Sequence, residues 1–124
     1  MYIYEADVIE VYDGDTITVN IDLGFNTHLH KQKFRLLYID APELRGDDKE
    51  FGKQVRDIVR DMILGKKVIL KTFNDSKGKY GRWLCEVWVG DLNLNEWLIE
   101  NQYAKLYEPD LIVLKKRKLN EPSR

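Results

Sequence analysis

Four acidic residues form two close pairs in the first third of the chain. Asp13 and Asp15 flank a glycine, and Asp40 and Glu43 flank an Ala-Pro pair. Carboxylates that converge repel one another unless a cation lies between them. Oxygen ligands of this kind suit hard divalent ions such as Ca²⁺ or Mg²⁺. The pattern therefore indicates a metal site, although Asp13 in a turn and Asp40 before a proline also fit purely conformational roles.

Two arginines could act on a substrate near these acids. Arg35 stands five residues before Asp40, and Arg82 follows a turn-rich segment. The planar fork of a guanidinium matches a phosphate group, and two such groups could stabilise the charge that develops on a phosphodiester under attack. Either arginine could also be a solvent-exposed charged residue without a catalytic role.

Histidine and cysteine offer weaker signals. The i, i+2 spacing of His28 and His30 puts both on one strand face, but that spacing alone fixes no tetrahedral metal site. Cys85 is the single cysteine, so no intramolecular disulfide can form. Alternation places it on the inward face of its strand, and we expect a buried, inert thiol.

The tryptophans and the basic end of the chain could contact nucleic acid. Aromatic rings can stack on bases; we expect Trp83 and Trp97 in the core, whereas Trp88 lies on the opposite strand face. The run Lys115–Lys118 could bind phosphates. It also fits a solubilising or disordered tail.

Three strands are predicted before the first helix. Residues 4–12 are rich in Tyr, Val and Ile, and Asp13-Gly14 is a strong tight-turn signal. Residues 15–22 alternate, with Ile17, Val19 and Ile21 on one face. A third strand fits residues 29–40, and Pro42 ends it because proline cannot donate to a strand ladder. If strands two and three pair antiparallel, Asp15 and Asp40 fall near one end of the hairpin.

Helical and extended segments alternate after Pro42. Asp47 and Glu50 have capping-box spacing before apolar residues at helical spacing, and Gly65 closes this helix. Strands are expected over 66–73 and 82–89, and Asn93 with Glu96 predicts a second capped helix that ends near residue 101. The order βββ-α-ββ-α predicts an α+β, mainly β fold. It is a five-stranded OB-like barrel with two or three helices packed on it, although other α+β folds share this pattern.

Composition indicates one ordinary soluble domain. The chain has 124 residues, with 44% hydrophobic and 33% charged residues. Five bases and one acid in residues 115–124 give that segment +4, which leaves −5 on the rest of a chain whose net charge is −1. A nucleic-acid binder usually has a basic surface, whereas carboxylates that await a cation would explain part of this acidity. The N-terminus lacks the basic and apolar regions of a signal peptide, so we expect a cytoplasmic protein that does not enter membranes. A phage-encoded protein would also fit this expectation.

Three segments resemble the signature blocks of the staphylococcal nuclease (thermonuclease) family. They are Asp13-Gly-Asp-Thr16, Phe34-Arg-Leu-Leu37 running into Ile39-Asp-Ala-Pro-Glu43, and Lys79-Tyr-Gly-Arg82. The segments 95–98 and 104–105 are similar to the second helix of the family and to the residues just after that helix. The likeness covers about residues 4–107, and the order of the blocks makes it specific. It implies the OB-like barrel and hydrolysis of DNA and RNA that breaks the phosphodiester on its 5′-oxygen side and leaves 3′-phosphate ends.

The resemblance also implies roles for individual residues. Asp15, Asp40 and the backbone carbonyl of Ala41 would bind Ca²⁺, and Asp13 would support the ion through water. Glu43 would be the general base that deprotonates the attacking water. The expected phosphate and substrate contacts are Arg35, Arg82, Lys79, Tyr80 and Tyr107.

The chain departs from the family at several positions. Ala41 replaces a threonine; a carbonyl ligand survives this change but a hydroxyl contact does not. Gln102 replaces the glycine that usually ends the second helix, and we expect Asn101 to take the left-handed conformation instead. The second hairpin is longer than usual, and the long C-terminal helix is reduced to a short basic tail. We therefore divide the chain into a nuclease domain, 1–108, and a tail, 109–124.

Two functions fit this sequence. The first is an active, monomeric, Ca²⁺-dependent nuclease whose partner is nucleic acid, because the site acids and arginines are all present. The second is a nucleic-acid or protein interaction module that keeps the barrel without catalysis, which the acidic body favours slightly.

Overall fold

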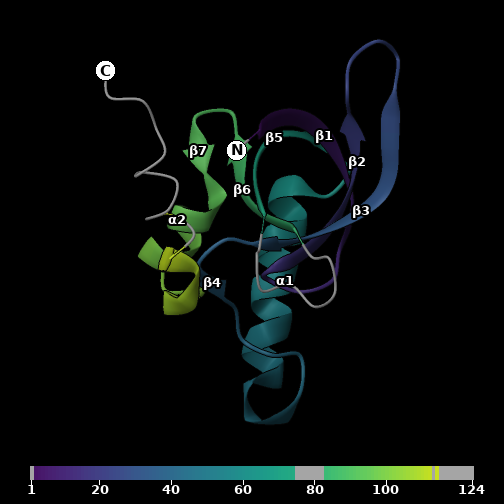
Figure 1. The fold of residues 1–124 in the computed structure, drawn as a ribbon. Coiled ribbons are helices and arrows are strands. Elements are labelled where there is room, and N and C mark those ends of the chain that lie inside the picture. Colours follow the sequence, from purple (N-terminus) through teal and green to yellow (C-terminus); the bar gives the residue numbers. More distant parts are fainter. Residues whose placement is uncertain (1, 75–82, 113, 115–124) are drawn as a thin grey trace.

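A closed barrel of five strands dominates the computed structural model, which describes residues 2–74, 83–112 and 114 (Figure 1). The strands are β1 (Tyr2–Val11), β2 (Thr16–Asp22), β3 (His28–Leu36), β5 (Lys67–Asn74) and β6 (Trp83–Val89). All neighbours pair antiparallel except β3 and β6, whose parallel pairing closes the circle. This confirms the predicted OB-like barrel, with a helix inserted after its third strand.

The first hairpin forms as its sequence predicts. Tyr12 donates its backbone N–H to the carbonyl of Thr16 at 3.0 Å around the Asp13-Gly14 turn. The alternating Ile17, Val19 and Ile21 are all buried in the core. Since a one-residue slip would expose this whole set, the alternation fixes the register of β2 against both neighbours.

The second hairpin is long and reaches beyond the barrel, as Figure 1 shows for the connection between β2 and β3. Its tip carries Phe25 and Asn26, both with positive φ, and the Phe25 side chain is fully exposed. The third strand does not continue to residue 40 as predicted. The chain turns at Tyr38, whose φ is 53°, and the short β4 (Ile39–Asp40) pairs with β8 (Lys105–Leu106) instead.

The helix α1 (Lys49–Ile63) follows a single 3-10 turn, η1 (Gly46–Asp48), and runs beneath the barrel in Figure 1. Its buried side chains Val55, Val59 and Ile63 join the strand residues in one core. The predicted Asp47 cap is wrong: the N-cap is Asp48, and its side chain accepts no capping hydrogen bond, because η1 already leads the chain into the helix. Gly65 closes the helix with a φ of 73°, as predicted.

The helix α2 (Leu94–Glu100) follows β7 (Leu92–Asn93), and the 3-10 turn η2 (Glu108–Asp110) follows β8. The Asn93 cap is confirmed, because its Oδ1 accepts the backbone N–H of Glu96. The prediction for the helix end is wrong. Asn101 has a φ of −92° and Gln102 has a φ of 62°, so glutamine occupies the left-handed position of the usual glycine.

Burial of the tryptophans differs from the prediction at one position. Trp83 is 45% exposed, because it is the first residue of β6 and lies at the end of the strand. Trp97 is partly buried against the core. Trp88 is also partly buried, and the Lys71 ammonium lies 4.5 Å from its ring centroid.

Candidate active site

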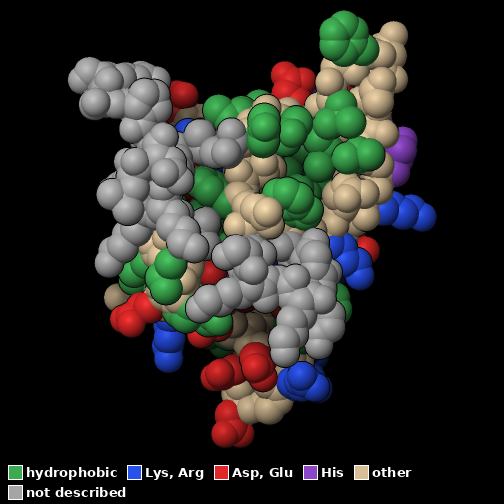
Figure 2. Space-filling view, viewed as in Figure 1, with side chains coloured by type: hydrophobic (Ala, Val, Ile, Leu, Met, Phe, Trp, Pro, Cys, Tyr) green, Lys and Arg blue, Asp and Glu red, His purple; other side chains and the backbone are tan. Residues whose placement is uncertain are grey.

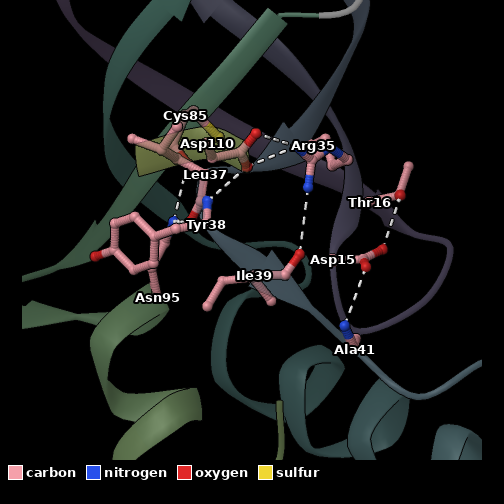
Figure 3. A network of polar contacts seen from close by, with 10 residues as sticks. All are labelled: Asp15, Thr16, Arg35, Leu37, Tyr38, Ile39, Ala41, Cys85, Asn95 and Asp110. Carbon is pink, nitrogen blue, oxygen red and sulfur yellow. Dashed lines mark hydrogen bonds and ion pairs between the residues drawn. The ribbon is translucent and has the colours of Figure 1, made fainter. Parts of the chain in front are cut away.

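Asp15 joins the first turn to the segment that comes after β3 (Figure 3). Its Oδ2 accepts the backbone N–H of Ala41 at 3.1 Å, and its Oδ1 accepts the Thr16 hydroxyl at 3.2 Å. The backbone N–H of Asp15 donates to Oδ1 of Asp13 at 3.0 Å. The structure therefore brings the predicted residues Asp13, Asp15 and Ala41 into one corner.

Two glycines allow this corner to pack tightly on α1. A Cβ on Gly14 would lie 2.7 Å from the Val55 side chain and 2.8 Å from the Ala41 side chain. A Cβ on Gly52 would lie only 2.2 Å from the carbonyl oxygen of Glu43. The helix thus supports the backbone of residues 41–43 from below, and glycine is required at both contacts.

Burial and a neighbouring carboxylate strongly perturb Asp15. Together they raise the pKa of Asp15 from 3.8 to about 7; loss of solvent is the largest cause, and the hydrogen bond and charge of Asp13 act in the same direction. The hydrogen bonds from Ala41 and Thr16 lower the pKa but are weaker. The carboxylates of this corner therefore lack a compensating positive charge, which either a proton or a cation can supply.

Asp40 and Glu43 are exposed, and both line an open groove of about 380 Å³. Residues 102–105 also line this groove, whereas Asp15 and Arg35 do not. Within residues 2–74, 83–112 and 114, no three His, Cys, Asp or Glu side chains are arranged to hold a metal ion. The four predicted acids thus lie on neighbouring segments without forming a preorganised ligand cluster.

Arg35 lies beside this corner, because it pairs with Thr16 across β2 and β3. Its Nη1 donates to the carbonyl of Ile39 at 3.3 Å. Its Nη2 lies 2.7 Å from Oδ1 and 2.6 Å from Oδ2 of Asp110, which forms an ion pair with it. The guanidinium carbon is 4.8 Å from the ring centroid of Tyr107.

Asp110 is a site residue that the sequence did not reveal. It is 5% exposed and lies 75 residues beyond Arg35 in the chain, within the segment that we assigned to the tail. An acid after a proline is typical of a turn, and no periodic pattern links it to β3. The boundary after residue 108 remains a prediction.

Asn95 is a second residue whose structural role was not predicted. Its Oδ1 accepts the backbone N–H of Val87 at 3.0 Å, while its Nδ2 donates to the carbonyls of Leu37 and Cys85 at 3.1 and 3.0 Å. Figure 3 shows it beneath the turn after β3. By tying α2, β6 and this turn together, Asn95 holds the segment that leads to Asp40.

The remaining candidates contribute less to the geometry. Arg82, Lys79 and Tyr80 lie outside the described residues. His28 and His30 are exposed on β3, with ring centroids 6.3 Å apart, and their role remains open. Cys85 is fully buried and burial raises its pKa, which confirms the expected buried thiol and disfavours a nucleophilic role.

Charge on the visible surface is mixed. Figure 2 shows basic side chains scattered among acidic ones on this face, with hydrophobic side chains gathered over the strands. No helix in the described part of the chain is long and apolar enough to cross a membrane.

Comparison with known proteins identifies the family of this chain. Residues 33–121 match the model of the staphylococcal nuclease homologue family. The chain belongs to this family. The matched region includes Arg35, Asp40, Glu43 and Asp110, while the Asp13-to-Asp15 turn precedes it.

Similar curated proteins differ widely in length. A thermonuclease of Staphylococcus hyicus is 33% identical over 108 residues, which cover 83% of this chain and 60% of the relative. A thermonuclease of Staphylococcus intermedius is 32% identical over 108 residues, covering 83% and 61%. Endonuclease YhcR of Bacillus subtilis is 33% identical over 114 residues, covering 84% and 9%. The chain thus spans about 60% of the length of the thermonucleases that it matches.

Proposed function

We propose that this protein is a Ca²⁺-dependent nuclease that hydrolyses phosphodiester bonds of DNA, RNA or both. Family membership supports a nuclease or nucleic-acid-binding role in general. The observation that carries the finer proposal is the corner itself. A partly buried carboxylate beside β2, exposed acids after β3 and a guanidinium on β3 lie on adjoining segments.

The residues of the corner suit a hard cation. The donors are oxygens only, which Ca²⁺ prefers, and the raised pKa of Asp15 marks a carboxylate that lacks a compensating charge. Asp15, Asp40 and the carbonyl of Ala41 would hold the ion, with Asp13 in support. Bound there, Ca²⁺ would neutralise phosphate charge and orient the nucleophile.

The side chains would then divide the chemistry between them. Glu43 accepts a proton from the attacking water through its exposed carboxylate. The water oxygen attacks phosphorus while the bond to the 5′-oxygen breaks. That oxygen takes up a proton from solvent water, so the products are a 3′-phosphate and a 5′-hydroxyl. Arg35 and Arg82 donate N–H groups to the non-bridging oxygens, where negative charge grows in the transition state. Lys79, Tyr80 and Tyr107 would contact the substrate on either side.

A direct assay tests the proposal. Purified protein is incubated with single-stranded DNA, duplex DNA and RNA, either with Ca²⁺ or with a chelator, and product ends are identified by their response to phosphatase. We expect cleavage only with Ca²⁺. Glu43→Gln and Arg82→Ala should each lower kcat by about 100-fold or more, whereas Glu50→Gln, an exposed acid in the first turn of α1, should not. If none of the three substrates is cleaved with Ca²⁺, the nuclease proposal is wrong.

The second candidate is a binding module on the same barrel. It is favoured by the ion pair between Arg35 and Asp110, which occupies a guanidinium that a phosphate would need, and by the acidic body. Tight binding of an oligonucleotide in Ca²⁺ without any cleavage would identify this function.

A further inference from the structure

Asp110 contacts the one described arginine that the proposed chemistry uses. Its carboxylate takes both contacts from Nη2 of Arg35, at 2.7 and 2.6 Å. The side chains of this pair are only 18% and 6% exposed, for Arg35 and Asp110 respectively. Water and salt weaken the attraction within a surface salt bridge, but they weaken it far less when the pair is mostly buried. The geometry of this pair is therefore held more firmly.

The backbone around Asp110 is itself fixed to the end of β3. Tyr38 donates its N–H to Oδ2 of Asp110 at 2.7 Å and accepts the N–H of Tyr107 at 2.7 Å through its carbonyl. The N–H of Asp110 closes the turn onto the carbonyl of Tyr107 at 3.2 Å. The segment 107–110 therefore forms a clasp over the turn that leads from Arg35 to Asp40.

The clasp and the carbonyl of Ile39 together hold the guanidinium through three contacts. Asp110 holds Nη2, the carbonyl of Ile39 holds Nη1, and the Tyr107 ring covers one face at 4.8 Å. Among the described residues, Nε of Arg35 makes no hydrogen bond. A guanidinium has five N–H donors in a rigid plane, so donors remain for a phosphate while the plane itself cannot rotate.

We propose that Asp110 is a positioning residue that orients Arg35 toward the scissile phosphate. The inference rests on the proposed nuclease function. It assigns a role to a residue in the segment predicted as the tail, and it adds Asp110 alone to the groups that act on Arg35. Since a displacement of about 1 Å in a catalytic group can cost about 100-fold in rate, release of Arg35 should act on turnover rather than on substrate affinity.

A double-mutant cycle tests the coupling. The variants are Asp110→Asn, Arg35→Gln and the combination, with Glu108→Gln as a matched control because Glu108 is an exposed acid of the same turn. Cleavage of single-stranded DNA in Ca²⁺ gives kcat and KM, and thermal unfolding is recorded for every variant. We expect Asp110→Asn to lower kcat by about 10- to 100-fold with KM within about 3-fold. Added to Arg35→Gln, the same change should alter kcat by less than about 3-fold.

The outcomes separate this inference from the proposed function. A folded Asp110→Asn variant with the wild-type kcat overturns the inference. A loss of kcat that is equally large with Arg35 present and with Arg35 replaced by Gln also overturns it, because Asp110 would then have a structural role only. A raised kcat or a lowered KM also overturns it, because the carboxylate would then be blocking the phosphate. If Asp110→Asn does not fold, Asp110→Glu keeps the charge and moves the carboxylate by one methylene. An unchanged kcat in the Asp110→Glu variant would also overturn the inference. An inactive wild-type protein refutes the nuclease proposal, and this inference with it.

Discussion

Gly52 offers a sharp test of how α1 positions the proposed general base. It is a buried residue within α1, and a Cβ there would lie 2.2 Å from the carbonyl oxygen and 2.8 Å from the carbonyl carbon of Glu43. The carbonyl oxygen of Pro42 would be 3.0 Å away. All three neighbours are backbone atoms, so no side chain can rotate out of the way when Gly52 is replaced by alanine.

The size of the effect follows from these distances. Real Cβ contacts are essentially never shorter than 3.0 Å, so the helix and Glu43 must separate by at least the 0.8 Å between 2.2 and 3.0 Å. Overpacking of this kind costs about 1–3 kcal/mol, while alanine gains about 1 kcal/mol over glycine inside a helix. We expect a net destabilisation of about 1 kcal/mol, or about 4 °C in Tm. A shift of nearly 1 Å in Glu43 should lower kcat by about 100-fold.

The assay pairs kinetics with unfolding. Single-stranded DNA hydrolysis in Ca²⁺ and thermal unfolding are measured for Gly52→Ala and for Gln54→Ala, an exposed position of the same helix. The control should change kcat by less than about 2-fold, since surface substitutions seldom disturb a distant site. A Gly52→Ala protein with wild-type kcat and unaltered or raised Tm would refute the reasoning, because the helix and the 42–43 backbone could then not be in contact as described.

Four further predictions concern charge, metal binding, packing and reactivity. Folding raises the pKa of Asp15 from 3.8 to about 7, so the native state keeps a proton that the unfolded chain releases. Stability of the metal-free protein should therefore fall by a few kcal/mol from about pH 4 to pH 7 and then level off; thermal unfolding in chelator should show this fall, and Asp15→Asn should lack it. Ca²⁺ replaces that proton, so it should raise Tm more at about pH 8 than at about pH 5.5; an equal rise at both values would contradict this. Asn95→Ala should lower the free energy of unfolding, measured in urea, by about 3 kcal/mol, because it leaves three buried backbone groups without their hydrogen-bond partner. Asn101→Ala, at the exposed helix end, should lower it by under about 1 kcal/mol. Cys85 should resist a thiol reagent in the native protein and react on denaturation; rapid labelling of the folded chain would show that the strand opens easily.

Local patterns account for the features that could be predicted. The Asp13-Gly14 turn and the alternation from Ile17 to Ile21 are set by neighbouring residues, and both are confirmed. The order of such elements, together with the resemblance of the three sequence blocks to the family, predicted the OB-like barrel. The helix end was mispredicted because asparagine is the commoner left-handed residue, yet hydrogen bonds from Tyr103 and Ala104 to the Leu98 carbonyl accompany a left-handed Gln102.

Long-range contacts could not be predicted in the same way. The pairing of Arg35 with Asp110 spans 75 residues, and its partners carry no periodic or motif signal that would link them. The break at Tyr38 was equally hidden, because Leu36 to Ile39 is typical of an uninterrupted strand, and only the contacts of Asp110 and Asn95 show why the chain turns there.

The parallel pairing of β3 with β6 also constrains how the chain folds. Phe34 pairs with Trp83, a residue far later in the sequence, whereas the β1–β2 and β2–β3 hairpins join near neighbours. Folding rates fall as contacts become less local, because the entropy of closing a long loop is lost before the contacts form. The hairpins should therefore assemble first. The β1–β5 and β3–β6 pairings should form later, because β1–β5 joins residues 60 to 70 apart in the chain and β3–β6 joins residues 49 apart. Until both pairings form, strand edges remain unpaired and open to other chains, so aggregation during refolding should depend on how quickly these two pairings close the barrel.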